Sequence, residues 1–470
     1  MTAGSRRAGG SKPDPEWPTA RWVSLALVLT IAAAIVLAGV GGSPEATRSL
    51  ALIFLTIGLW ATAAIPEHLT ALLFFALAML FAVAPASITF AGFHAAATWL
   101  IFGGLVIGVA IHGTGLGTKI ANRLAGLFGR TYAGVVVGLA AVGIALAFLM
   151  PSSMGRVMLL MPIALALADR YGFAEGSNGR TAIVLSMLLG AFFVPFSILP
   201  ANVPNIVLLG LSEDIHGIVP TYGQWLALHF PVLGLVKAAA GVVLILTMFP
   251  DRPREAAAAP APAPLSAPER RLGLILIAAL AGWLTDFAHG ISPAWIALAA
   301  AAACFTPGLG ILAVRDFEKV NFASMFYVAG ILGIGALVAE SGWGTRLGQT
   351  LIDMSPLGPD QPVANFLALV GIGMGVSLIT TVAGMPAVMT PLAGDLAAST
   401  GLALDTVLML QVLSFSTPIL VYQVAPIVVA VQISGIAHRD AAKLLFAMAA
   451  VTLLILFPLD FLWLRLLGLF

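Results

Sequence analysis

The sequence predicts an all-α polytopic membrane protein, with about eleven transmembrane helices and two re-entrant hairpins in an inverted repeat. Of its 470 residues, 60% are hydrophobic and 9% are charged, whereas a soluble domain is about 45–50% apolar and about 25% charged. A soluble fold of this composition could not cover its own surface, which excludes soluble enzymes, nucleic-acid-binding proteins and disordered proteins. The single cysteine, Cys304, excludes a disulfide framework and a cysteine-based metal site.

The chain begins with a polar stretch rich in glycine and proline, residues 1–20, which predicts a disordered cytoplasmic tail. Residues 21–45 contain an apolar run of about 20 residues, enough to cross roughly 30 Å of hydrocarbon. A cleaved signal peptide is the alternative, but its apolar core would be shorter. We therefore expect the first transmembrane helix in this segment.

Ten further apolar stretches are long enough to cross the membrane: 49–65, 68–86, 97–112, 181–211, 225–249, 271–288, 293–312, 322–339, 402–435 and 441–468. Two others, 132–168 and 363–394, do not fit one crossing each, and both carry glycine, proline and Ser/Thr in the middle. Because Pro and Gly interrupt helices, we predict that these two stretches are re-entrant hairpins.

The basic residues orient this topology. On the predicted cytoplasmic side lie 17 of the 22 lysines and arginines, and three (Arg48, Arg346 and Arg465) lie on the other side. This distribution follows the positive-inside rule and predicts a multi-pass protein of the inner (plasma) membrane with its N-terminus in the cytoplasm. The remaining two, Arg156 and Lys237, fall inside the membrane region.

The chain divides into two halves that resemble each other. The segment 250–270 is rich in Pro and Ala and charged, which predicts a semi-rigid cytoplasmic linker between repeat 1 (46–249) and repeat 2 (271–470). At a constant offset of 227 residues, Gly103, Gly108 and Gly115 match Gly330, Gly335 and Gly342. Similar composition is the alternative explanation, but a constant register favours a true repeat. Inverted repeats with interrupted helices are typical of secondary transporters.

The middle of the first hairpin carries the candidate binding residues Ser152, Ser153, Met154 and Arg156. A buried guanidinium is costly and therefore needs a partner or a purpose. Its planar fork suits carboxylate, sulfate or phosphate, and the N-terminus of the second hairpin arm also favours an anion. A structural ion pair is the alternative. We favour an anion site.

Polar residues also lie at the other helix breaks. They are Thr380, Thr381 and Gly384 in the second hairpin, Asn202 and Asn205 in 190–210, and Thr417, Tyr422 and Gln423 in 413–435. Each alone could merely bridge two helices, but four breaks in a repeated scheme predict a binding site. For Lys237 we favour an ion pair or snorkelling over a transport role. We find no catalytic or cofactor motif and expect no enzyme activity; a channel would need rings of like charge.

These motifs resemble the divalent anion/sodium symporter (DASS) family of the ion-transporter superfamily. The resemblance is carried by GGLVIGVAIHGTGLGTKIA (103–121), PSSMGRVMLLMP (151–162), PANVPN (200–205), ITTVAGMPAVMTP (379–391) and YQVAP (422–426). It implies an elevator-type homodimer in the lipid bilayer that transports a small anion (dicarboxylate, citrate, sulfate or similar), often driven by sodium.

The hairpin tips depart from this family. Where the family has Ser-Asn-Thr, this chain has Ser152-Ser153-Met154 and Thr381-Val382-Ala383. The missing asparagines leave at most a residual sodium site near Ser152, Ser153, Ala201 and Thr381. Our hypothesis is that the charge of Arg156 partly replaces sodium. Sodium coupling, proton coupling and anion exchange stay open, as does a related permease for arsenite-type or other anions.

Overall fold

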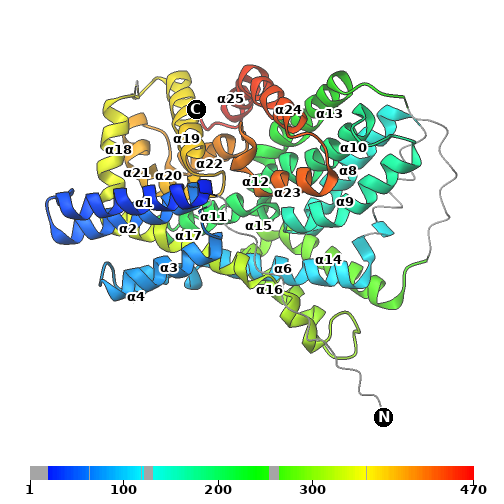
Figure 1. Ribbon diagram of the computed structural model, residues 1–470, viewed down its shortest axis with the longest axis horizontal. Coiled ribbons are helices and arrows are strands. Elements are labelled where there is room, and N and C mark those ends of the chain that lie inside the picture. Colours follow the sequence, from blue (N-terminus) through cyan, green and yellow to red (C-terminus); the bar gives the residue numbers. More distant parts are fainter. Residues whose placement is uncertain (1–18, 63, 118, 121–130, 253–263, 356) are drawn as a thin grey trace, which may run out of the picture.

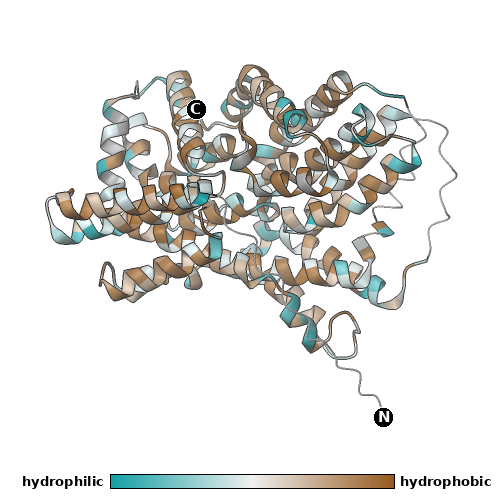
Figure 2. Ribbon diagram, viewed as in Figure 1, coloured by the Kyte–Doolittle hydropathy of each residue, from teal (hydrophilic) through white to brown (hydrophobic). Residues whose placement is uncertain are grey.

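The computed structural model describes the chain except residues 1–18, 63, 118, 121–130, 253–263 and 356. Over the described residues the protein is helical and has no strand, as predicted. Eight of the described helices are long and apolar enough to cross a membrane. Figure 2 shows these helices as largely hydrophobic, with hydrophilic residues gathered in loops and at helix ends. Leu27, Val243 and Leu454 are exposed on such helices, as expected for contact with lipid.

The described helices that precede each hairpin form one part of the fold. Before hairpin 1 they include α1 (Thr19–Ala38), which precedes repeat 1, and then α2 (Pro44–Thr62), α3 (Glu67–Leu80), α4 (Ala86–Thr89), α5 (Ala91–His94) and α6 (Ala96–Thr114). From the second half they are α14 (Ala267–Leu284), α15 (Asp286–His289), α16 (Pro293–Cys304), η5 (Val314–Lys319), α17 (Phe322–Glu340) and α18 (Trp343–Asp353). Helix α6 packs against α16 and α17 packs against α3. Since α3 matches α16 and α6 matches α17 at the repeat offset, each contact is the counterpart of the other.

Both predicted stretches form helical hairpins, and the first arm of each is itself long and apolar enough to cross a membrane. Hairpin 1 consists of α8 (Tyr132–Leu149) and α9 (Ser153–Arg170). Hairpin 2 begins with α19 (Pro362–Ile379) and returns through α20 (Met385–Met389), η6 (Thr390–Leu392) and α21 (Ala393–Thr400). Its second arm extends beyond the predicted residue 394, until Gly401 adopts a left-handed conformation with φ of 72° and ends the helix.

The two helices predicted to be interrupted are broken. The first consists of α10 (Asn178–Leu188), η1 (Leu189–Phe193), η2 (Val194–Ser197), η3 (Leu199–Ala201) and α11 (Val203–His216). The second consists of α22 (Leu404–Phe415), η7 (Val421–Gln423) and α23 (Ala425–Ser434). Their halves pack on different hairpins: α10 lies on hairpin 1 but α11 contacts α20, and α22 lies on α19 but α23 contacts α9. The breaks therefore lie between the two hairpins, which are on opposite sides of the view in Figure 1.

The last helix of each half contains a π-helical segment. The first runs through α12 (Tyr222–His229), η4 (Phe230–Val236) and α13 (Lys237–Met248), and the second through α24 (His438–Val451), η8 (Thr452–Leu456) and α25 (Phe457–Leu466). Pro231 lies within the first π segment and Pro458 follows the second. Proline lacks the N–H that would continue an α-helical ladder, which accounts for these irregular turns.

Two helix ends differ from the boundaries of the predicted segments. The first helix ends at Ala38, earlier than the predicted residue 45. Helix α14 begins at Ala267, inside the predicted linker, because Ser266 and Glu269 form a capping box there. Most of the predicted tail (1–18) and the middle of the linker (253–263) lie outside the described residues.

Candidate functional site

The two hairpin tips are closed by the same hydrogen bond. The hydroxyl of Ser152 accepts from the backbone N–H of Gly155, and that of Thr381 accepts from Gly384, both at 3.1 Å. At hairpin 1 this bond caps the start of α9, whereas at hairpin 2 it closes the turn that precedes α20. Because Ser152 and Thr381 are 229 residues apart, as are Gly155 and Gly384, the tips are equivalent positions of the two halves.

Arg156 lies one turn after the first tip and is fully buried. Its Nε donates to the carbonyl of Ala191 (3.0 Å), and Nη1 donates to those of Met150 (2.5 Å) and Ala201 (3.0 Å). Its Nη2 donates to Oδ1 of Asn202 at 3.1 Å. The guanidinium therefore joins the tip of hairpin 1 to both ends of the break in the first broken helix.

All four of these partners are neutral oxygens. No carboxylate of the described residues forms an ion pair with Arg156, so neither a structural ion pair nor snorkelling toward Asp169 accounts for it. Asp169 instead pairs with Arg180. The irregular η1 and η3 turns leave carbonyls without helical donors, and the guanidinium satisfies them. A positive charge without a formal counter-charge is thus held beside the hairpin 1 tip.

The two asparagines of the first break also bind backbone carbonyls. Besides accepting from Arg156, Asn202 donates from Nδ2 to the carbonyl of Phe192 at 3.2 Å. Asn205 donates to those of Phe196 (3.0 Å) and Ile198 (2.9 Å), while its own Oδ1 is buried without a partner in the described chain. Both amides hold the broken segment in shape.

The second break uses Gln423 in the corresponding way. Its Nε2 donates to the carbonyl (3.0 Å) and hydroxyl (3.2 Å) of Ser377 on hairpin 2. Its Oε1 accepts from the backbone N–H groups of Ile419 (2.9 Å) and Leu420 (2.8 Å). The neutral amide of Gln423 therefore joins hairpin 2 to the second broken helix. At hairpin 1 the corresponding link to the first broken helix is made by a cation.

The remaining predicted residues are placed as follows. The hydroxyls of Thr380 and Thr417 bond to backbone carbonyls one turn earlier, those of Val376 and Leu413. Ser153 is buried in the first turn of α9, Met154 and Gly384 are half-buried, and the side chain of Tyr422 lies outside the described part of the chain.

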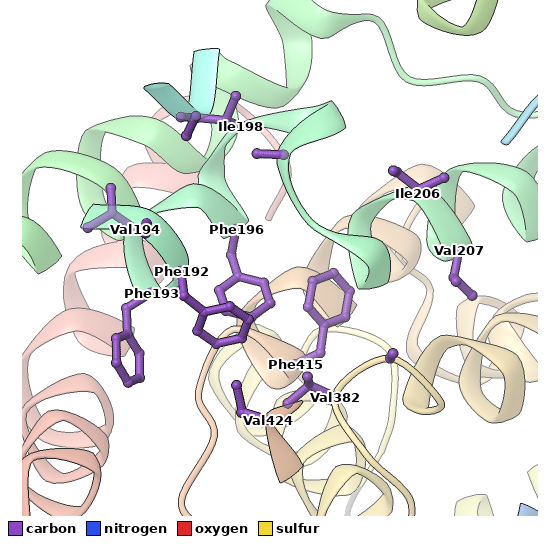
Figure 3. Packing of buried hydrophobic residues seen from close by; sticks show 14 of the residues in the cluster. Phe192, Phe193, Val194, Phe196, Ile198, Ile206, Val207, Val382, Phe415 and Val424 are labelled. Atoms are coloured by element: carbon purple, nitrogen blue, oxygen red, sulfur yellow. The ribbon is translucent and has the colours of Figure 1, made fainter. Parts of the chain in front are cut away.

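An aromatic cluster, which the sequence analysis missed, lies between the two breaks. Figure 3 shows Phe192, Phe196 and Phe415 meeting there, with Val382 and Val424 beside them. The ring centroids of Phe192 and Phe196 are 5.0 Å apart, and those of Phe196 and Phe415 are 5.9 Å apart. All three rings are buried. The run GAFFVPF (190–196) is the signal that could have indicated an apolar wall at the first break.

A small cavity lies beside the hairpin 2 tip. Its lining residues are Ile57, Trp60, Tyr327, Thr380, Thr381, Gly384 and Ala387. The Tyr327 hydroxyl and Thr381 share a hydrogen bond. Hairpin 2 thus contacts α2 and α17. Hairpin 1 instead contacts α6 so closely that a Cβ added to Gly104 would lie 3.0 Å from Pro151.

Hairpin 1 does not fit a sodium ion. The converging carbonyls of Met150 and Ala201 are already bound by the Arg156 guanidinium, and a second cation there would meet like charge. The hydroxyl of Ser152 is engaged in the tip cap. Among the described residues, no group of three or more His, Cys, Asp or Glu side chains could hold a metal.

Comparison with known proteins identifies this arrangement. The profile of the sodium:sulfate symporter transmembrane region matches residues 19–470. The chain belongs to the sodium:sulfate symporter family. The resemblance to divalent anion/sodium symporters is thereby confirmed, and the protein is a membrane transporter by family.

Relatives of this family member are membrane proteins too. It is 24% identical over 386 residues to a protein of Cupriavidus necator named "Membrane protein", covering 74% of each chain. It is 24% identical to the inner membrane protein YbhI of Escherichia coli, covering 53% of this chain and 54% of YbhI. The crystal structure of the Alcanivorax borkumensis YdaH transporter has the same fold, with a TM-score of 0.55, 16% identity, and coverage of 84% of this chain and 90% of that one.

Proposed function

We propose that this protein is a secondary active transporter of a small anion, in which Arg156 supplies the positive charge of the binding site in place of a sodium ion. The observation behind the proposal is the buried guanidinium held by four neutral oxygens at the hairpin 1 tip. Since no described carboxylate neutralises it, its field acts on whatever lies between the breaks. A unit charge about 5 Å away, at an effective dielectric constant of about 20, contributes about 3 kcal/mol.

The role of Arg156 in this proposal is electrostatic. Four of its five N–H donors are engaged with the protein, so the guanidinium attracts an anion through its charge and shapes the tip that would contact it. Direct hydrogen bonds to the substrate would come from Ser153 and the free N–H groups at the start of α9.

The aromatic cluster supports an organic anion as the substrate. Phe192, Phe196 and Phe415 lie between the breaks, and aromatic rings favour contact with apolar groups. An organic carboxylate with a hydrocarbon part therefore fits better than sulfate or an arsenite-type oxyanion.

Transport would follow an elevator mechanism in a homodimer. Hairpins 1 and 2 and the broken helices would move as a unit against the helices around α6 and α17. This part of the proposal, and the orientation with a cytoplasmic N-terminus in the inner membrane, rests on the family resemblance and on the distribution of basic residues.

Counterflow into proteoliposomes tests the proposal. Labelled succinate, citrate and sulfate are offered to vesicles preloaded with the same unlabelled anion, in sodium and in choline buffers. We expect preloading to accelerate uptake of an organic acid equally in both buffers. Uptake that ignores the preloaded anion would indicate a channel, and an absolute need for sodium would contradict the role of Arg156.

A further inference from the structure

A second group of buried ionisable residues lies away from the hairpins. Lys237 is 1% exposed, inside the apolar span Tyr222–Met248. Its Nζ donates to the carbonyl of Ser416 at 2.6 Å. Ser416 ends α22 at the second break, where the helix dipole is negative and favours a cation. Lys237 therefore binds the second break much as Arg156 binds the first.

Asp460 is the acidic neighbour of Lys237. It is 1% exposed, inside the span His438–Leu466, and neither carboxylate oxygen has a hydrogen-bond partner among the described residues. Asp460 and Lys237 form no direct ion pair among the described residues, but helix α25, which carries Asp460, packs against η4, which Lys237 follows, and their opposite charges attract. Lys237 directly follows the π segment η4, and Asp460 lies four residues after the π segment η8. The π segments pack against each other, which brings the two groups together.

Other ionisable groups on the packed helices are accounted for. His229 is fully buried on α12, with both ring nitrogens unpartnered and its ring 5.2 Å from that of Trp225. Tyr222, also on α12, has a buried hydroxyl without a partner among the described residues, and Asp286 accepts from its backbone N–H while one carboxylate oxygen stays buried and unpartnered there. Tyr132 bonds to the carbonyl of Phe249, Arg180 to Asp169, and Arg439 and Lys443 to Asp440, while His438 and Arg465 are exposed. His229 and Asp286 are thus the competing proton acceptors in this region.

A buried carboxylate without hydrogen bonds is costly as an anion and accepts a proton readily. The positive charge of a nearby lysine stabilises the ionised carboxylate, so that both protonation states are accessible. Arginine, in contrast, stays protonated in proteins. The two breaks therefore differ: the cation at the first is permanent, whereas the pair at the second can change its net charge.

We propose that Lys237 and Asp460 form the proton-binding site that couples anion transport to a proton gradient; this inference rests on the proposed function. Protonation of Asp460 changes the pair from net zero to net positive charge beside the second break. The added charge strengthens anion binding, and by linkage the anion strengthens proton binding. One proton and one anion then cross together, and both dissociate on the far side.

The test uses wild-type protein, Asp460→Asn and Lys237→Met in proteoliposomes, with His229→Gln as the matched control from the same region. Labelled succinate and citrate serve as probes, and the membrane potential is clamped with valinomycin and equal potassium. Two quantities are measured on each preparation: equilibrium exchange at equal pH, and accumulation driven by an inward proton gradient. Exchange reports whether the protein is folded and carries the anion.

We expect wild-type protein and His229→Gln to accumulate the anion about tenfold per coupled proton for each pH unit of gradient. Relative to exchange, accumulation by Asp460→Asn and Lys237→Met should fall to the level without a gradient. Wild-type exchange without gradient-driven accumulation overturns the inference and leaves the proposed function standing. Accumulation that survives both substitutions, or that only His229→Gln abolishes, overturns it as well. Absence of wild-type exchange overturns both.

Discussion

Arg156 and Met385 occupy equivalent positions in the two hairpins, each four residues after the hydroxyl that caps its tip. Both side chains are fully buried, yet one carries a full positive charge and the other none. The two halves thus share the tip geometry, closed by Ser152 and Thr381, but differ in electrostatics. Each half of the chain therefore provides a matched control for substitutions in the other.

Removing the guanidinium should create a cation site. Arg156→Ala leaves the carbonyls of Met150, Ala191 and Ala201 without donors, and we expect a loss of about 3 kcal/mol in unfolding free energy. Sodium could then bind these oxygens. At ten times its Kd it would restore about 1.4 kcal/mol. The measurement is the unfolding temperature in detergent with sodium chloride or choline chloride.

The control for this substitution is Met385→Ala. It should lose stability through a cavity of similar size, but without any response to sodium. If sodium raised the unfolding temperature of both variants and of wild-type protein alike, the carbonyls at hairpin 1 would not form a cation site.

The two tip hydroxyls should contribute unequally to stability. Ser152→Ala removes a helix N-cap, which costs about 1 kcal/mol, whereas Thr381→Ala removes both the bond that closes the turn and the hydrogen bond with Tyr327, so it should cost more. Because the two hydroxyls share no hydrogen bond, the double variant should lose the sum of the two. Urea or thermal unfolding of the three variants measures this. A marked departure from additivity would mean that the tips are mechanically coupled.

Gly190 should tolerate no side chain. A Cβ there would lie 2.0 Å from the carbonyl oxygen of Ala140, so Gly190→Ala forces the η1 segment away from α8. We expect loss of monodisperse protein in size-exclusion chromatography. Gly371→Ala is the control, since nothing lies within 4 Å of its Cβ, and it should be neutral or stabilising by about 0.5 kcal/mol. Equal behaviour of the two variants would argue against this helix packing.

Glu269 should make stability sensitive to acid. The hydrogen bond from Lys119, with a 2.7 Å Nζ–Oε2 distance, lowers the pKa of the Glu269 carboxyl, and the Ser266 capping bonds lower it further. A lowered pKa in the folded state means that this contribution is present above the unfolded pKa and is lost as the pH falls through the folded one. Unfolding temperatures measured down to and below about pH 4.3 should fall more steeply for wild-type protein than for Glu269→Gln. Parallel curves would count against the prediction.

Much of the fold followed from the sequence because its signals are local. Apolar length predicted a polytopic membrane protein, with eleven crossings expected where eight described helices are long and apolar enough to cross. Proline and glycine in mid-span predicted the turns of both hairpins and both helix breaks. Ser152 and Thr381 each lie ten residues before a proline, Pro162 and Pro391, and this shared spacing predicted that they occupy equivalent positions in the two hairpins. These features depend on residues within a few turns of each other.

The interior of the candidate site could not be predicted in this way, because its contacts join distant residues. Arg156 binds carbonyls up to 45 positions away, at Ala201, and Lys237 binds Ser416 across 179 positions. Backbone carbonyls have no sequence signature. The sequence therefore suggested an anion site or an ion pair for Arg156 and an ion pair or snorkelling for Lys237, where the structure has carbonyl oxygens. Asp460 was overlooked, although an acidic residue in the apolar span 441–468 was the signal for it.

The four oxygens bound by Arg156 are held by a cation that belongs to the chain, which removes a dependence on the ion concentration of the medium. A dissolved ion fills a site only in proportion to its concentration, and it is lost when the site opens. A cation attached to the backbone has an effective concentration that the medium does not change. The contact between hairpin 1 and the first broken helix therefore does not depend on the sodium concentration of the medium.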